Sequence, residues 1–261
     1  MLHCNIDGVD FVGVGALRPD RPQLVIGPDG FEGWDDGVDV RRDEVARPWG
    51  SDGSFASSGN REGRVVSLSG VAITRSAEET AALGRRLLGV LARGGSGRLT
   101  VQSPGGRRFA SAYLHGRPRF VVDGLDPTAA KWSLQLWCPD PRKFGDRVPL
   151  RVTGPGEAQA IFHYGNYFAS PELIVRGSLP NGYSVEGPGY TFVVGRAVTT
   201  STPHRIDCAT GLLRIGNAVQ LGAITSGSGW VIAPGTAPVT HRLVPVSGTG
   251  TLETVLRDTD I

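Results

Sequence analysis

The sequence predicts a mainly β protein with one helix, built from a β-rich N-terminal domain and a C-terminal β-sandwich. Glycine and proline contribute 38 and 18 of the 261 residues, which favours short strands joined by turns. A helix-capping pattern followed by helical spacing of apolar residues occurs near residues 77–93. After Gly156, short β-rich runs recur without a helical period. We therefore expect domains at residues 1–155 and 156–261.

The first sixty residues contain one apolar strand-like run, at 23–26, and a long charged segment at 31–60. That segment mixes aromatic side chains with both signs of charge, which suits contact with a neighbouring subunit better than a monomer's core. The alternative is a solvated, partly mobile loop. The candidate subunit-contact residues are Trp34, Arg41, Arg42, Asp43, Arg47 and Trp49.

The central part of the first domain carries the strongest local signals. Residues 63–74 alternate as a long strand, and Ser76 with Glu79 forms a capping box. A stripe of Leu83, Leu87, Val90 and Leu91 then predicts a helix that packs on a sheet and ends at Gly94-Gly95. The remaining strands are predicted at 98–102, 107–115, 117–122, 131–138 and 148–152. We expect this half to leave strand edges and the charged segment unsatisfied until further copies complete them.

The sequence of the second domain predicts strands and no helix. They are predicted at 158–163, 172–176, 183–186, 190–198, 204–207, 212–215, 218–221, 230–232, 240–246 and 251–256. Asn-Gly and Gly-Pro-Gly separators are typical of tight turns between such strands. This spacing without helices indicates a sandwich or barrel.

Charge, cysteine and hydropathy exclude several functions. The net charge is +2, with both signs interleaved, so we expect no specific nucleic-acid partner. Cys4, Cys138 and Cys208 are odd in number and widely spaced, which disfavours a disulfide framework or zinc site. No signal peptide or membrane-spanning run is visible, so we expect synthesis in a cytoplasm and no membrane anchor.

Motifs for catalysis are missing from the sequence, so we expect no enzyme, cofactor or metal. The five histidines follow no metal-ligand spacing, although folding could gather His163, His204 and His241. No phosphate-binding loop or nucleophile elbow occurs. A cell-wall hydrolase could in principle use carboxylates among Asp35, Asp36, Asp39 and Asp43, but the neighbouring Arg41 and Arg42 favour ion pairing.

A carbohydrate-binding sandwich is the alternative function. Sugar sites often stack a ring on an exposed aromatic side chain, and Tyr183, Tyr190 and Trp230 are the candidate platforms. Each lies in an apolar run, where burial in the core is the simpler expectation.

The order of elements resembles the distal tail proteins of long-tailed, siphovirus-type phages, often described as minor tail proteins. The resemblance rests on residues 47–53, the 63–74 strand, the 79–91 helix, the Trp132–Trp137 run and residues 139–145 (Pro-Asp-Pro-Arg-Lys-Phe-Gly). In the second half, residues 162–167 and 171–175 are similar to the family's entry into a galectin-like domain.

This resemblance implies a structural virion protein at the tail tip, a baseplate hub without catalytic residues. It implies a homohexameric ring built from the N-terminal halves, with the galectin-like sandwiches outside the ring. The partners would be further copies of itself, the tail tube protein, the tape measure protein and the tail-tip proteins. A near-neutral charge and a mixed-charge segment fit a closed ring with head-to-tail contacts and an open lumen.

Overall fold

The computed structural model describes residues 1–18, 20–43, 45–47, 52–56, 58–187, 189–227, 229–235 and 238–261. Within them the protein is mainly β with one α-helix, so the predicted fold class is confirmed. The chain forms two compact units, one of residues 1–143 with Ile261 and one of residues 144–260. The sequence analysis placed its domain boundary after Pro155, about a turn and a short strand later. Each unit is described by itself below.

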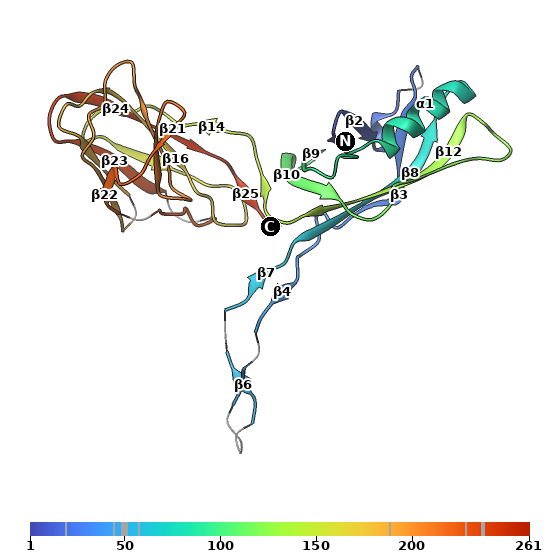
Figure 1. Ribbon diagram of the computed structural model, residues 1–261, viewed down its shortest axis with the longest axis horizontal. Coiled ribbons are helices and arrows are strands. Elements are labelled where there is room, and N and C mark those ends of the chain that lie inside the picture. Colours follow the sequence, from blue (N-terminus) through green and yellow to red (C-terminus); the bar gives the residue numbers. More distant parts are fainter. Residues whose placement is uncertain are drawn as a thin grey trace. The chain divides into compact units, whose positions relative to one another are not determined.

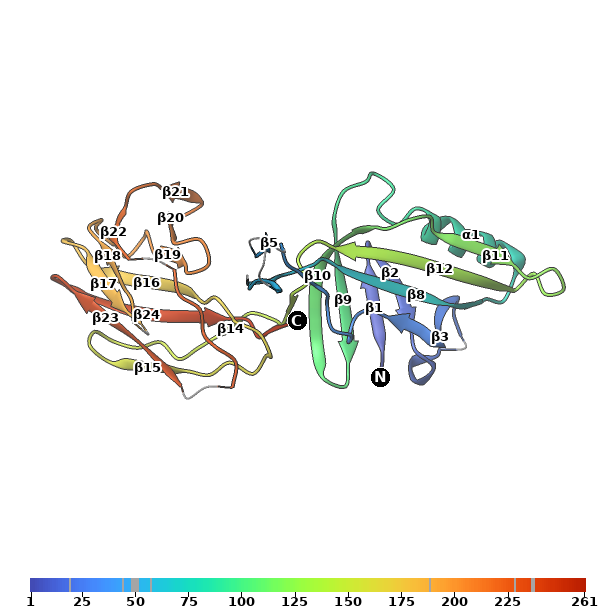
Figure 2. The same ribbon diagram turned by 90° about the horizontal axis from the view of Figure 1, so that it is seen from below.

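Seven strands of unit 1 close into a barrel (Figures 1 and 2). Their order is β12-β8-β3-β2-β1-β9-β10, and β10 pairs with β12 to complete the ring. β2 and β3 are parallel, whereas the other neighbours are antiparallel. The bounds are β1 His3–Ile6, β2 Val9–Val12, β3 Gln23–Glu32, β8 Arg64–Ile73, β9 Gly97–Ser103, β10 Gly106–Leu114 and β12 Ala129–Cys138. An eighth strand, β11 (Arg119–Val122), pairs with the first part of β12, along the same edge of β12 that β10 uses farther on.

Closure of the barrel corrects one expectation. The first half of the chain was expected to leave strand edges for other copies, but each of the seven barrel strands has a hydrogen-bonded neighbour on both sides; among the described strands of the barrel sheet, β11 pairs with β12 alone. Because a closed ring of strands has no edge, subunit contacts cannot be made by adding strands to it.

The barrel interior is filled by the alternating residues of its strands. Every second residue is buried throughout β12 and in the first half of β8. These buried residues include Val66, Leu68, Leu134 and Leu136. The rings of Phe11 and Trp132 pack with centroids 5.0 Å apart in this core. The predicted strands at 63–74 and 131–138, each with one buried face, are confirmed.

The helix α1 (Ala77–Leu88) begins and packs as its sequence predicts. Ser76 Oγ accepts a hydrogen bond from the Glu79 amide, which satisfies one of the orphan donors of the first turn. The Glu79 carboxylate accepts from the Arg75 amide, one residue earlier than an ideal capping box. Gly84 lies against β11, because a Cβ there would stand 2.8 Å from the Phe120 ring. The helix ends at Leu88, before the predicted end near residue 93, and Leu91 beyond it has a left-handed φ of 50°.

The first hairpin was missed by the sequence analysis. β1 and β2 are joined by Asp7 and Gly8, which both have positive φ, at 52° and 74°. A short 3-10 helix, η1 (Val14–Ala16), follows. β3 begins where predicted, at Gln23, but continues past the predicted Ile26 to Glu32 through an irregularity in its pairing with β8.

Unit 2 is a sandwich of two antiparallel sheets. One has the order β14-β24-β16-β19-β20-β21 and the other β15-β23-β17-β18-β22. The bounds are β14 Val148–Pro149, β15 Ala158–Ile161, β16 Glu172–Ser178, β17 Tyr183–Glu186, β18 Thr191–Val194, β19 His204–Asp207, β20 Leu212–Ile215, β21 Ala218–Gln220, β22 Ile224–Ser226, β23 Val239–Pro245 and β24 Thr249–Leu256. Two short strands, β13 (Lys143–Phe144) and β25 (Thr259–Asp260), lie close to the two points where the sequence passes between units.

Most strands predicted for the second domain are confirmed, and the sandwich with them. Several predicted strands were too long, and one was wrong. The strands predicted at 158–163 and 190–198 are reduced to β15 and β18, and the strand predicted at 148–152, at the end of the first domain, is reduced to the two residues of β14. Residues 230–232 form no strand, although Ile232 makes an isolated bridge with Ala169. β22, at Ile224–Ser226, was not predicted.

Candidate functional interface: the arm of unit 1 and its root

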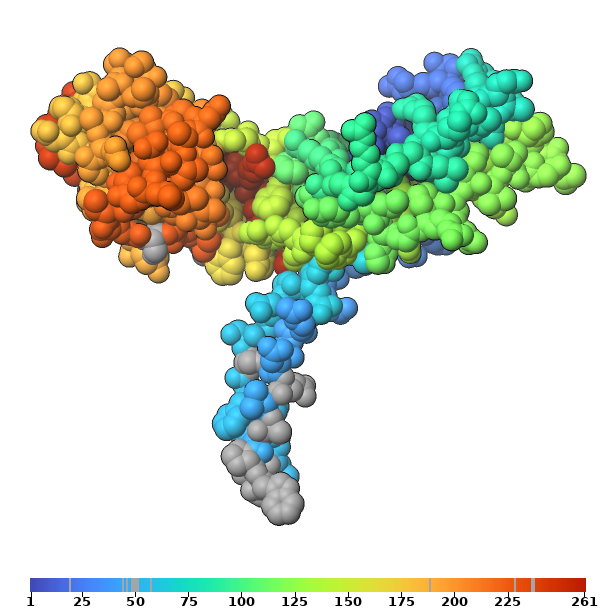
Figure 3. All heavy atoms as spheres, viewed as in Figure 1, coloured from blue at the N-terminus to red at the C-terminus, as the bar shows by residue number. Residues whose placement is uncertain are grey.

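Residues 33–63 connect β3 to β8 as a long hairpin outside the barrel, which we call the arm (Figures 1 and 3). Near the barrel β4 (Val40–Arg41) pairs with β7 (Asn60–Arg61), and farther out β5 (Val45–Ala46) pairs with β6 (Ser54–Phe55). These ladders are two residues long, so the described part of the arm has little backbone pairing of its own. An isolated two-stranded hairpin is marginally stable in water, which suggests that the arm needs a surface to lie on.

The described arm residues expose apolar and charged side chains together. Val40, Val45 and Phe55 are 38%, 59% and 56% exposed. The predicted contact residues Arg41, Arg42, Asp43 and Arg47 are also exposed, and the Arg47 guanidinium lies 5.9 Å from the centre of the Phe55 ring. Trp49 lies outside the described residues. An exposed mixture of aromatic, aliphatic and arginine side chains is the composition of a protein–protein interface.

A buried arginine fixes the point where the arm leaves the barrel. Arg64, the first residue of β8, is 2% exposed. Its Nη1 donates to the carbonyl oxygens of Gly33, Trp34 and Asp36 at 2.6, 2.8 and 2.8 Å, and its Nε donates to Pro141 O at 3.3 Å. Burial lowers the pKa of Arg64 below its usual value, partly offset by Cys138, Asp35 and Asp36. A guanidinium stays protonated in proteins, so Arg64 holds these carbonyls as a charged donor.

A second buried cation reinforces this root. Lys143 Nζ donates to Trp34 O at 2.9 Å, lies 3.8 Å from the Asp35 carboxylate and faces the Trp34 ring at 5.6 Å from its centre. Trp34 was predicted to contact a neighbouring subunit, but its side chain is 2% exposed and belongs to the core of unit 1. Its role in this chain is to cover the barrel interior below the arm.

Glycines permit the tight backbone approach on both sides of the root. Gly33 has a φ of 79°, and a Cβ there would lie 1.9 Å from Val65 O. A Cβ on Gly63 would lie 2.5 Å from Trp137 Nε1. The arm therefore starts and ends at positions that side chains would obstruct. The cations Arg64 and Lys143 were not singled out from the sequence, because only the fold brings them to the turn after β3.

Two of the four carboxylates considered for a hydrolase, Asp35 and Asp36, lie at the same root. The Asp36 side chain accepts from the Gly33 amide at 2.8 Å, and Asp35 is near Lys143. Among the described residues, no group of three or more His, Cys, Asp or Glu side chains could hold a metal ion. The arrangement can therefore position an arm.

The three histidines considered as metal ligands each have a different side-chain partner in unit 2. His204 Nδ1 is 3.2 Å from the Tyr183 hydroxyl, His241 accepts from Trp230 Nε1 at 2.8 Å, and His163 lies 3.3 Å from the Asp258 carboxylate. Burial lowers the pKa of His204, and it lowers that of His241 to about 4. All three cysteines are buried, and burial raises the pKa of Cys4 to about 12 and of Cys138 to about 11.

Two of the three carbohydrate-platform candidates are buried. Tyr183 is 0% and Trp230 3% exposed, and both belong to the core between the two sheets. Tyr190 is half exposed and remains a candidate. A buried ring offers no face to a sugar, so the alternative function loses most of its proposed surface.

Comparison with known proteins places the fold. No protein-family model and no curated protein matches this sequence. The solved structure of the SPP1 Dit protein, described as a paradigm of hub adsorption apparatus in Gram-positive infecting phages, matches all of this chain and all of its own chain, with a TM-score of 0.71 and 13% identity. A chain of the phage P2 baseplate in its activated conformation with Ca matches over 99% of this chain and 98% of its own, with a TM-score of 0.55 and 9% identity. The likeness extends through both units.

Within the described residues, no helix is long and apolar enough to span a membrane.

Proposed function

We propose that this chain is a structural subunit of a phage tail, a distal tail hub that assembles as a ring. The observation that carries the proposal is the likeness in fold to the SPP1 Dit protein over the full length of both chains, at a TM-score of 0.71. The likeness covers the β-barrel unit with its helix and long hairpin as well as the β-sandwich unit.

The arm is the part of the chain that suits ring closure. It exposes Val40, Val45 and Phe55 on short ladders, and its root is held rigid by Arg64 and Lys143. A rigid root with an exposed arm can reach a neighbouring copy in a defined direction. When one patch of a subunit binds a different patch of the next, the contact is heterologous and repeats until a ring closes.

The outer face of the barrel offers a surface for such a contact. Val65 on β8 is paired with Trp137 on β12, and Trp137 is paired with Tyr113 on β10. The ring centres of Tyr113 and Trp137 are 6.0 Å apart. These side chains are 39%, 42% and 36% exposed. An exposed aromatic strip on a closed barrel is typical of an interaction surface.

The location and partners follow from this role. We propose that the ring lies in the virion at the tail tip, between the tail tube protein and the tail-tip proteins, around the tape measure protein. The resemblance noted from the sequence suggests six copies. The role is structural, without catalysis.

Truncation of the arm tests the proposal. The purified full chain is expected to form a ring of six by mass photometry and negative-stain electron microscopy. The truncated variant joins Asp39 to Glu62 by an Asn-Gly turn, since the Glu62 amide bonds Asp39 O at 2.9 Å and can carry a hairpin there. It retains Arg64 and its carbonyl partners and is expected to be a folded monomer.

The matched control replaces only Arg41 and Arg42 by alanine, which leaves the hairpin length unchanged. This variant should assemble more weakly but still form rings. A full chain that stays monomeric at all concentrations up to the millimolar range, or a truncated chain that assembles as well as the full one, contradicts the proposal.

A further inference from the structure

The turn between β11 and β12 presents one leucine to solvent. Leu125 is 98% exposed and stands between Asp123 and Asp126. Asp123 Oδ1 accepts from the amides of Leu125 and Asp126 at 2.8 and 3.3 Å, and the Asp123 amide bonds Ala129 O at 2.9 Å. The turn is thus held by its own hydrogen bonds with the leucine at its tip.

The same turn is anchored to helix α1. Thr80 Oγ1 donates to Pro127 O at 2.8 Å, and Thr74 donates from its amide and Oγ1 to Thr128 O at 3.0 and 2.9 Å. Asp126 Oδ1 accepts from the Thr128 amide and hydroxyl. An exposed leucine on a fixed turn loses little conformational entropy on binding, which distinguishes it from an ordinary surface leucine.

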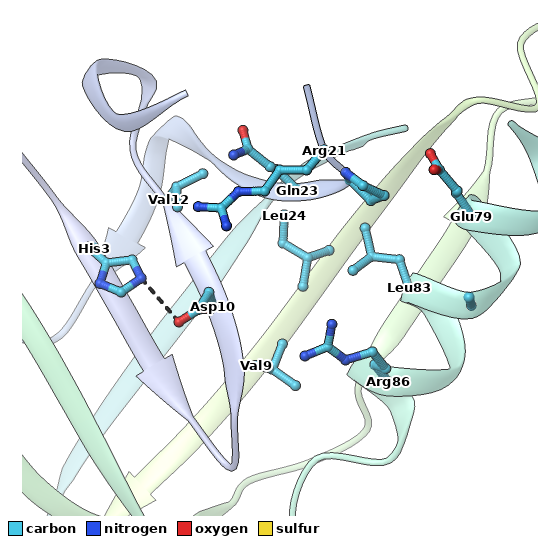
Figure 4. A pocket seen from close by; sticks show the side chains of 12 residues that line it. His3, Val9, Asp10, Val12, Arg21, Gln23, Leu24, Glu79, Leu83 and Arg86 are labelled. Carbon is cyan, nitrogen blue, oxygen red and sulfur yellow. Dashed lines mark hydrogen bonds and ion pairs between the residues drawn. The ribbon is translucent and has the colours of Figure 1, made fainter. Parts of the chain in front are cut away.

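A pocket of about 360 Å³ lies between helix α1 and strands β1 to β3 of the same unit (Figure 4). Its apolar part is formed by Val9, Val12, Leu24 and Leu83. Figure 4 shows Leu24 and Leu83 pointing toward each other, with Arg21 and Arg86 on either side of them. A volume of this order is sufficient for a small apolar group with its polar surroundings.

The charge around the pocket is uneven. Its two carboxylates already have partners: Asp10 accepts from Asn5 at 2.7 Å and lies 3.1 Å from His3, and Glu79 pairs with Arg75 at 2.7 Å. Arg86 donates to a backbone carbonyl, Gly8 O, at 3.0 Å. Within the described part of the chain, neither Arg21 nor Arg86 is within ion-pairing distance of a carboxylate. The pocket therefore combines an apolar interior with two cations that lack an acidic partner.

The turn and the pocket use different faces of helix α1. Glu79, Ala82, Leu83 and Arg86 line the pocket at the spacing of one helix face. Thr80 and Gly84 lie on another face and contact the turn and β11. Since the two surfaces do not coincide, a turn of one copy that enters the pocket of the next would make a heterologous, head-to-tail contact.

We propose that the Leu125 turn of one copy docks in the Arg21–Arg86 pocket of the next copy. Leu125 covers the mouth of the pocket beside Pro22 and Ala82, over the buried Leu24 and Leu83, and the carboxylates of Asp123 and Asp126 lie against Arg21 and Arg86. This inference rests on the proposed ring, and it adds a second contact that is independent of the arm.

Cross-linking tests the docking directly. In one chain Leu125→Cys is combined with Ala82→Cys, and the protein is treated with a short bismaleimide. The native cysteines are buried, so the introduced thiols react first. The double variant is expected to give a ladder of linked copies that ends at the closed ring, whereas each single variant gives at most dimers. A double variant that gives no more than dimers overturns the docking, and another protein's acidic segment would then be the candidate occupant.

Two charge and size variants measure the contact, with matched controls. Leu125→Asp and Arg86→Glu are each expected to weaken ring assembly at least about tenfold. The controls are Leu221→Asp, at a leucine of unit 2 that is 80% exposed, and Arg85→Glu, in the same helix turn but outside the pocket. Thermal unfolding checks that all four fold.

The results separate the docking from the proposed function. A full chain that forms rings, with both variants assembling like their controls, overturns the docking and leaves the ring hub in place. A full chain that forms neither rings nor cross-linked ladders overturns both. Weakened assembly of the two variants, with unaffected controls, supports the docking.

Discussion

Replacement of Arg64 by methionine should loosen the arm and destabilise unit 1. Arg64 donates to four carbonyl oxygens, and of these Trp34 O keeps a second donor in Lys143. The variant therefore leaves the carbonyls of Gly33, Asp36 and Pro141 without this donor. These three bonds are partly buried, and a hydrogen bond contributes about 1 kcal/mol, so we expect unit 1 to lose up to about 3 kcal/mol of stability. Methionine fills most of the volume, which keeps a cavity from adding to the loss.

An opposing effect limits this figure. The guanidinium is itself costly to bury, and its Nη2 has no hydrogen-bond partner among the described residues. Replacing buried ion pairs by apolar side chains can be neutral when both partners are removed, but the partners of Arg64 are backbone carbonyls that no side-chain substitution removes. The net effect should therefore remain a loss. Arg64→Lys, which keeps one charged donor, should fall between the variant and the wild type.

Hydrogen exchange measured by mass spectrometry reports the local stability of each unit separately within the full chain. Peptides of β3, β8 and the arm base should exchange faster in Arg64→Met, while peptides of unit 2 keep their protection. The matched control is Arg61→Met, which removes an exposed arginine with one bond to a carbonyl, Val38 O at 3.0 Å, and should change stability by no more than about 0.5 kcal/mol. Equal exchange in the two variants would refute the assignment of the root to Arg64.

Two further predictions concern a glycine of the root and a histidine of unit 2. Gly33→Ala should destabilise unit 1 by more than about 2 kcal/mol in urea unfolding, because its φ is 79° and its Cβ would meet Val65 O. The control is Gly53→Ala, at a φ of 86° with open space around it, which should show the conformational cost alone. Similar losses of stability in the two variants would contradict the role of the close approach at Gly33. His241 has a pKa lowered by burial to about 4, so unit 2 should be fully stable above pH 6.5 and lose up to about 3 kcal/mol as the pH falls from 6.5 to 4. The slope should flatten in His241→Gln, which can still accept from Trp230 Nε1, and an unchanged slope in that variant would show that another group is responsible.

The parts of the fold that could be predicted are those with local causes. The helix start is encoded by Ser76, whose side chain needs a partner only three residues away. The long β8 and β12 strands are encoded by alternation along ten residues each. The first hairpin was also locally encoded, because Asp7-Gly8 between short alternating runs is a strong signal for a tight turn, and the sequence analysis overlooked it.

The root of the arm could not be predicted in the same way. Trp34 appeared to be an interface residue because it stands among charges, but its side chain packs in the core of unit 1, and Arg64, 30 positions later, and Lys143, 109 positions later, both donate to its carbonyl oxygen. No local pattern links three such positions. For the same reason Trp230, whose indole donates to His241, could be weighed as a sugar platform or a core residue but not assigned from its neighbours in sequence.

Closure of the barrel determines what kind of assembly this chain can form. Because β10 pairs with β12, each of the seven barrel strands has a neighbour on both sides, and the closed ring offers no free strand at which two copies could be joined by an added strand. Side chains on the outer face of the barrel and on projecting segments are then the material for contacts between copies. The arm exposes Val40, Val45 and Phe55, and the β11–β12 turn exposes Leu125. Both segments are held to unit 1 by hydrogen bonds, from Arg64 for the arm and from Thr80 for the turn. Their orientation is therefore already set in the free subunit. Pre-oriented projections lower the entropy lost on association, and that allows small apolar contacts to hold a ring together.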